Sequence, residues 1–373
     1  MSCEVICCEV PALLHTLVDS TDGRLLIKLF TFLNQEGPLD CYLAGYFEKI
    51  LEMLFRKLTA HMMSFFNSIG VTLLKSFLSH VDNYSIMQII QRLMLPHLPF
   101  SAPSEGDDAG FNFEDQRDFD HCNWSFLNET CELLLTKMLK ADHPDVPLHI
   151  SDMLITVLQL SPPETLLVKY LCQSDSVRSL LISATTSAEE FLESQNDSDA
   201  PPSSSVASFV PEQYSLQNNI ALAATSVLES LISRLYESGF PLHNPTESDI
   251  SRTEQELFLI MNEQLNQICE EIAPNVPRFT ALLSNILQNT ERRNMKFTTK
   301  LVKPRLGHHG LQLVKLIESL IRVGNPTLDR SFCEHGLFEV CIDLLFAFEY
   351  NSIMHLSIQR IFVTIFEGPA TRR

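Results

Sequence analysis

The stretch from residue 43 to residue 58, LAGYFEKILEMLFRKL, decides the fold class of this chain. Its large apolar residues recur at intervals of three and four positions, which places them on one side of an α-helix. They are Leu43, Tyr46, Phe47, Ile50, Leu51, Leu54 and Leu58. A helix with one broad apolar stripe is unstable alone, so it must pack against neighbouring helices.

The same spacing recurs along most of the chain. Comparable stripes occupy residues 74–81, 86–94, 313–321, 337–348 and 354–365. No convincing run alternates apolar and polar residues in the manner of a β-strand. The sequence therefore predicts a protein built almost entirely of helices.

Helix-breaking residues stand between the stripes. Gly37-Pro38 separates two helices near the start, Gly324-Asn325-Pro326 ends another, and Gly336 opens the next. Gly or Asn can take the left-handed conformation that ends a helix, and Pro cannot continue one. The connections are therefore expected to be short turns.

Amphipathic helices joined by short turns are typical of an α-solenoid of the armadillo or HEAT kind, with repeats of roughly 40 residues. The chain has 373 residues, more than one compact core usually holds. We expect a single solenoid domain over residues 1–373. A compact multi-helix domain is the structural alternative.

Three segments interrupt the helical rhythm. Residues 96–121 are acidic and contain Pro, and residues 183–213 are acidic and rich in Ser. Neither carries an apolar stripe, so we expect two disordered surface loops. Residues 291–310 are basic in an otherwise acidic chain and are expected to form a linker.

The composition limits the partners and the compartment. The net charge is −19, which disfavours nucleic acid and anionic membrane surfaces as partners. No run of 18 uncharged apolar residues occurs, so membrane insertion is not expected. The ten cysteines are scattered without a CxxC pair, and the chain starts without a basic secretory signal. Scattered free thiols favour a cytoplasmic location, with the nucleus as a second compartment.

Sequence motifs of catalysis are missing from the chain. It has no phosphate-binding Gly-rich loop, no GxSxG elbow and no HExxH motif. The metal-binding motifs of Ser/Thr phosphatases, of the GDxHG and GNHE type, are missing as well. We expect a protein that is not an enzyme, with no catalytic residues, no cofactor and no metal.

The basic segment is the most informative electrostatic feature. Its six cations are Arg292, Arg293, Lys296, Lys300, Lys303 and Arg305. They form either a solvated linker or a docking site for an acidic partner surface.

Two stretches resemble a known family. Residues 2–95 include SCEVICCEVPALL and LLIKLFTFLNQEGPLDCYLAGYFEKILEMLF, and residues 304–368 include the GNPTLDR turn and the FAFEYNSIMH segment. In this order and separation they resemble the SAPS-domain family, with the N-terminal part of that domain missing. The chain departs from the family pattern at Gly310, where the family has Arg, and at Glu349-Tyr350, where it has Pro-Trp.

The resemblance implies a non-catalytic scaffold that binds the catalytic subunit of a phosphatase-six-type Ser/Thr phosphatase and directs its activity in cytoplasm and nucleus. It further implies ankyrin-repeat or other scaffold subunits as partners. Two other functions stay open: a solenoid adaptor for trafficking or transport cargo, and an enzyme with a cryptic site.

The candidate partner-binding residues come from physical reasoning, since the family offers no motif that transfers position by position. A solenoid binds partners through its concave face and the turns beside it. The candidates are the six cations of the basic segment together with Asn325, Asn351 and His355 at inter-helix turns.

Overall fold

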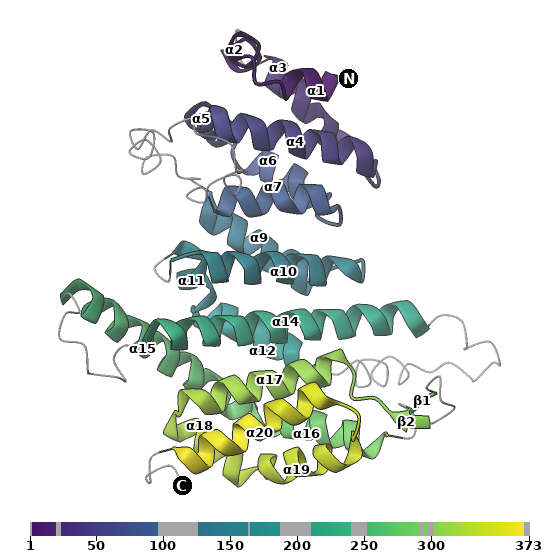
Figure 1. The fold of residues 1–373 in the computed structure, drawn as a ribbon, viewed down its shortest axis with the longest axis vertical. Helices are drawn as coiled ribbons and strands as arrows, with labels where there is room; N and C mark the ends of the chain where they lie inside the picture. The colour runs from purple at the N-terminus through teal and green to yellow at the C-terminus, as the bar shows by residue number, and fades with distance from the viewer. Residues whose placement is uncertain are drawn as a thin grey trace. The chain divides into compact units, whose positions relative to one another are not determined.

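The computed structural model describes residues 2–19, 24–95, 126–162, 165–186, 210–239, 252–290, 294–296 and 302–368. These residues are almost all helical (Figure 1), which confirms the all-α prediction. The chain divides into two compact units. Unit 1 holds Met1–Lys137 and Asp152–Ser161, and unit 2 holds Met138–Ser151 and Pro162–Arg373. The single solenoid domain over residues 1–373 stays a prediction.

Unit 1 is a succession of short helices. Its elements are α1 (Ser2–Ile6), α2 (Pro11–Asp19), α3 (Arg24–Phe30), the 3₁₀ turn η2 (Thr31–Asn34), α4 (Cys41–Lys57), α5 (Thr59–Ile69), α6 (Val71–Leu78), α7 (Tyr84–Met94) and α9 (Leu127–Leu139). The division between the units falls within α9, after Lys137, and again within α10 (Asp145–Leu160), after Ser151.

The stretch that decides the fold class forms α4 as predicted. Asp40 caps this helix by accepting hydrogen bonds from the backbone N–H groups of Tyr42 and Leu43. A side-chain acceptor at this position satisfies N–H groups that have no partner inside the helix. Of the predicted apolar stripe, Phe47, Ile50, Leu51 and Leu54 are buried in a core that contains aromatic rings, whereas Leu43 and Tyr46 are 52% and 53% exposed. The ring of Phe66 on α5 is fully buried there and lies 5.4 Å from that of Phe30.

Unit 2 contains longer helices. Its elements are α11 (Leu166–Leu171), α12 (Ser174–Thr185), α14 (Val210–Gly239), α15 (Arg252–Ile272), the 3₁₀ turn η5 (Ala273–Asn275), α16 (Val276–Gln288), β1 (Asn294–Lys296), β2 (Val302–Pro304), α17 (His308–Val323), α18 (Pro326–Glu334), α19 (Leu337–Ala347) and α20 (Ser352–Glu367). Helix α17 packs against both α14 and α20, so these three helices lie side by side (Figure 1). This layering is consistent with the armadillo or HEAT type of repeat.

The breaker at residues 324–326 acts as predicted. Gly324 has φ +76°, the left-handed conformation that ends α17. Asn325 caps α18, and Pro326 begins it, where the missing N–H of Pro costs nothing. The turn is therefore only two residues long between two packed helices.

The predicted boundaries of the second acidic loop, residues 183–213, are wrong at both ends. Residues 183–185 belong to the last turn of α12, because the buried stripe of that helix continues through Ala184 and Thr185. Residues 210–213 belong to the start of α14. The rest of this loop and the whole loop at residues 96–121 lie outside the described residues.

The basic segment at residues 291–310 is more structured than a linker. Its strands β1 and β2 pair antiparallel, with Met295 opposite Lys303. Three-residue strands are too short to show an alternating pattern, which explains why the sequence gives no sign of them. His308 and the two residues after it form the first turn of α17, which follows Gly307 at φ +85°.

No helix among the described residues combines the length and the apolar character that crossing a membrane requires.

Candidate partner-binding face

The three adjacent helices α14, α17 and α20 share a polar seam on their outer side. Glu229 on α14 is hydrogen-bonded to Ser319 on α17, and Tyr236, two turns further along α14, contacts Arg322, which is further along α17. The two helices are therefore parallel, as equivalent helices of successive repeats are. We call the outer surface of these three helices the α14–α17–α20 face.

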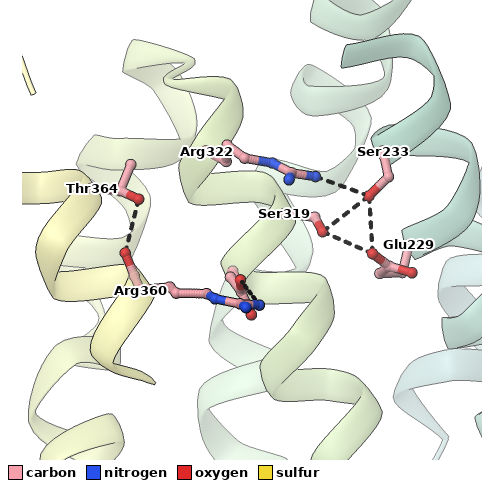
Figure 2. A network of polar contacts seen from close by, with 7 residues as sticks. Glu229, Ser233, Ser319, Arg322, Arg360 and Thr364 are labelled. Atoms are coloured by element: carbon pink, nitrogen blue, oxygen red, sulfur yellow. Dashed lines mark hydrogen bonds and ion pairs between the residues drawn. The ribbon is translucent and has the colours of Figure 1, made fainter. Parts of the chain in front are cut away.

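The centre of this face is a hydrogen-bonded cluster (Figure 2). One carboxylate oxygen of Glu229 accepts hydrogen bonds from the hydroxyls of Ser233 and Ser319, each at 2.9 Å. The two hydroxyl oxygens lie 3.2 Å apart. Ser319 is buried and Glu229 is half-buried, so the carboxylate is held between α14 and α17. Two donors on one oxygen compensate its loss of water.

Arg322 extends this cluster to the surface. Its Nη2 donates to Ser233 Oγ at 3.2 Å, and its guanidinium lies 5.1 Å from the ring centroid of Tyr236. A guanidinium over an aromatic face is attracted by the ring quadrupole. Arg322 is exposed, and these two contacts nevertheless fix its orientation.

A second glutamate–arginine pair joins α17 to α20 (Figure 2). Arg360 Nη1 donates to Glu318 Oε1 at 3.4 Å. The side chain of Glu318 is only 19% exposed, whereas that of Arg360 is 60% exposed. Solvent at this point therefore meets the cation rather than the carboxylate.

Unit 1 shows a similar arrangement on α4 and α7. These helices pack together, and Glu52 on α4 interacts electrostatically with Arg92 on α7. Burial lowers the pKa of Arg92, and Glu52 opposes that change. Burial also raises the pKa of Glu48 against a hydrogen bond from Ser85. The side chains of Glu48, Glu52 and Arg92 line a cavity of about 180 Å³. Glu52 and Arg92, like Glu318 and Arg360, are about 40 residues apart, the length of one repeat.

The structure describes only part of the predicted basic site. Arg292, Arg293 and Lys300 lie outside the described residues, and of Lys296 only the backbone in β1 is described. Arg305 is exposed just after β2.

Lys303 is the member of the basic segment whose contacts are clearest. Its Nζ donates to Glu349 Oε2 at 2.9 Å and lies 5.6 Å from the ring centroid of Tyr350. The hydrogen bond and charge of Glu349 raise the pKa of Lys303. Glu349 and Tyr350, the two positions at which the resemblance leads one to expect Pro-Trp, are thus the residues that contact Lys303. They fasten the hairpin to the turn between α19 and α20.

The three turn residues that were predicted to bind a partner have structural contacts. Asn325 is 7% exposed, caps α18 and donates to Asn266 Oδ1 at 3.1 Å. Asn351 caps α20 by accepting from the N–H of Met354. A ring nitrogen of His355 bonds the carbonyl of Phe348 at 3.1 Å. The partner role of these residues stays a prediction.

Gly310 is the other departure from the family pattern, and it has a packing reason. It is buried, and a Cβ placed there would lie 3.0 Å from Ile286 Cδ1 and 3.1 Å from Leu306 Cδ1. A larger side chain at this position therefore requires Ile286 and Leu306 to shift.

The α14–α17–α20 face was not predicted from the sequence. Its pairs join residues far apart in the chain, as with Glu229 and Ser319, which are 90 positions apart. A usable signal would have been the recurrence of a glutamate and an arginine about one repeat apart on successive amphipathic helices.

The described residues contain no cluster of three or more His, Cys, Asp or Glu side chains suited to a metal ion.

The chain matches a protein family over residues 148–373, namely SAPS, described as SIT4 phosphatase-associated protein. This match covers more than half of the chain and includes every element from α11 to α20. The chain therefore belongs to the SAPS family.

Several curated relatives are distant but match nearly the whole chain. One is serine/threonine-protein phosphatase 6 regulatory subunit 3-B of Xenopus laevis, 23% identical over 99% of this chain and 38% of its own length. Another is regulatory subunit 2 of Mus musculus, 21% identical over 99% of this chain and 35% of its own length. The chain thus spans less than two fifths of these relatives. No solved structure matches it.

Proposed function

We propose that this chain is a non-catalytic regulatory subunit that binds a phosphatase-six-type Ser/Thr phosphatase catalytic subunit and directs its activity. The observation that carries the proposal is the SAPS match over residues 148–373. The relatives that match nearly all of this chain are named phosphatase 6 regulatory subunits. Ankyrin-repeat or other scaffold subunits are further proposed partners, and cytoplasm and nucleus the proposed compartments.

The geometry that supports this proposal is a set of stacked helices with a polar outer face. Side chains on α14, α17 and α20 hold one another in fixed orientations across the helix boundaries. A surface whose side chains are already ordered loses less entropy when a partner binds, which favours a scaffold role.

The proposal is tested with the purified chain and a purified phosphatase-six-type catalytic subunit. A stable complex in size-exclusion chromatography supports it. Affinity purification from cells with mass spectrometry is the companion experiment. Recovery of trafficking or transport proteins, without any phosphatase catalytic subunit in either experiment, would replace the proposal by a cargo adaptor.

The basic segment is tested in the same assay. Arg292→Glu, Arg293→Glu and Arg305→Glu together should weaken catalytic-subunit binding and leave the fold unchanged. Each exposed charge contributes typically under about 1 kcal/mol, so the three are changed at once. Slower association of the parent at higher salt would support charge steering by the segment, because salt screens such steering. Unchanged binding by the triple variant would mean that the segment is only a solvated linker.

A further inference from the structure

On the α14–α17–α20 face, two contacts between a glutamate and an arginine or its neighbours turn the cation outward, although the chain as a whole is strongly acidic. In the pair between α17 and α20, the side chain of Glu318 is 19% exposed and that of Arg360 is 60% exposed. Between α14 and α17, Glu229 is half-buried beneath two serine hydroxyls, while Arg322 is exposed. In both places the carboxylate lies inward and the guanidinium outward.

Both arginines are associated with the same stretch of α17, Arg322 as part of it and Arg360 through Glu318. Glu318 and Arg322 are four positions apart on α17, so their Cβ atoms are about 6 Å apart. Arg360 reaches Glu318 from α20, and Arg322 points from the same stretch of α17 toward α14 (Figure 2). Lys315, three positions before Glu318, lies on the same side of α17.

Both guanidinium groups keep donors for a further ligand. Among the described residues, Arg322 forms one hydrogen bond, through Nη2, and Arg360 one at 3.4 Å through Nη1. A guanidinium has five N–H donors in a rigid fork that matches a carboxylate. Stacking on Tyr236 fixes the fork of Arg322 in place, so less entropy is lost when it binds.

Another arginine of unit 2 differs in this respect. Arg178 on α12 uses both Nε and Nη2 on Glu271 of α15, each at 2.9 Å. Its side chain is 59% exposed, almost the same as Arg360. The fork of Arg178 is thus already occupied by a carboxylate of the chain itself, which makes it a matched control.

We propose that Arg322 and Arg360 form a paired carboxylate-binding site that docks an acidic segment of the phosphatase catalytic subunit. This proposal rests on the proposed function and assigns to it one surface and one kind of contact. An acidic protein segment fits because two outward forks, with Lys315 beside them, complement aspartate and glutamate side chains. Arginines held in position are also the residues that commonly dominate the energy of protein interfaces.

The test compares affinity for the purified catalytic subunit in the parent, in Arg322→Gln/Arg360→Gln, and in Arg178→Gln. The double variant should bind about tenfold or more weakly, because two charge-assisted contacts are lost. The ratio of its affinity to that of the parent should rise with added salt, because salt screens the local attraction that only the parent has. Arg178→Gln should bind as the parent does. A double variant that binds no more weakly than Arg178→Gln overturns the proposal and leaves the proposed function standing.

A second variant guards against a change in folding. Arg322→Lys/Arg360→Lys keeps both charges and removes both forks, so it should bind several-fold more weakly than the parent with an unchanged helical circular dichroism spectrum. Parent-like affinity in this variant overturns the paired-fork geometry. A parent chain that does not bind the catalytic subunit overturns the proposed function and this inference with it.

Chemical footprinting gives a result that a purely structural role would not produce. Phenylglyoxal modifies accessible arginines, and the sites are read by mass spectrometry. In the complex, Arg322 and Arg360 should be protected relative to the free chain, whereas Arg178 should react equally in both. Equal reactivity of Arg322 and Arg360 in the two states overturns the proposal.

Discussion

Asn325→Ala should destabilise unit 2 by about 2 kcal/mol. Asn325 Oδ1 accepts from the N–H groups of Thr327 and Leu328 at 2.9 and 3.3 Å, and the side chain is 7% exposed. Loss of an N-cap costs about 1 kcal/mol. Leu328 is fully buried, so its N–H would lose its acceptor away from water, which places this cap at the upper end of the usual range, about 2 kcal/mol. The bond to Asn266 adds little because Asn266 is exposed.

The assay is thermal and urea unfolding followed by circular dichroism. For a unit of this size, about 2 kcal/mol corresponds to a fall in Tm of about 4 to 8 °C. Asn325→Asp is the matched control, because a carboxylate caps a helix equally well and favours its positive N-terminal end. Its stability should stay within about 0.5 kcal/mol of the parent.

The same pair of variants decides between a capping role and a partner-binding role. A cap predicts that Asn325→Ala lowers stability and that Asn325→Asp does not. If Asn325→Ala keeps the Tm of the parent but loses affinity for the catalytic subunit, the capping argument is refuted and the contact is with the partner.

Three more predictions concern packing and charge. Gly310→Val should cost about 1 to 3 kcal/mol, because its side chain would press on Ile286 and Leu306; an unchanged urea midpoint would show that they can move aside. Phe66→Ala should cost about 3 to 5 kcal/mol, since this fully buried ring contacts the rings of Phe30, Phe55, Phe65 and Phe77, and Phe66→Leu should cost less in the same urea series. The hydrogen bond from Lys57, together with Arg56, lowers the pKa of Glu9 in the folded chain. The stability from this contact is therefore present above the unfolded pKa of about 4.3 and is lost as the pH falls through the lower pKa of the folded state. Glu9→Gln should therefore be less stable than the parent at pH 7, with the difference vanishing in acid unfolding experiments.

Helices and their ends were predictable because their signals are local. The stripe at residues 43–58 and the breaker at residues 324–326 each act within a few residues of themselves, and the structure has both. The sequence predicts the start of the loop at residue 183, which is too early, because the small side chains of Ala184 and Thr185 do not stand out as part of an apolar stripe. Both side chains are buried, and this burial depends on tertiary packing that the local sequence does not show.

The candidate face was out of reach for the opposite reason. In the sequence, Arg322 is a single charged residue near the end of α17, with nothing to set it apart. Its contacts with Ser233 and Tyr236 arise only because α14 packs beside α17. The sequence instead drew attention to the basic segment, where cations are adjacent along the chain. Of that segment, Lys303 turns out to be engaged by Glu349 within the same unit.

Net charge and local surface charge diverge at two ion pairs of unit 2, whereas in the pair of Lys303 with Glu349 the glutamate is the more exposed partner, at 57% against 33%. In the pairs of Arg360 with Glu318 and of Arg178 with Glu271, the glutamate is the less exposed partner, at 19% and 26%. A partner at long range meets the field of a chain with net charge −19, which repels an acidic surface. Within a Debye length of about 8 Å the nearest charges decide, and at Arg322 and Arg360 those are guanidinium groups, because the carboxylates of Glu229 and Glu318 are less exposed. Binding of an acidic partner there would thus depend on short-range geometry more than on steering.

Rising salt then has two opposed effects, since it screens the general repulsion and weakens the local attraction. Their balance distinguishes this face from a simple basic patch, for which salt only weakens binding.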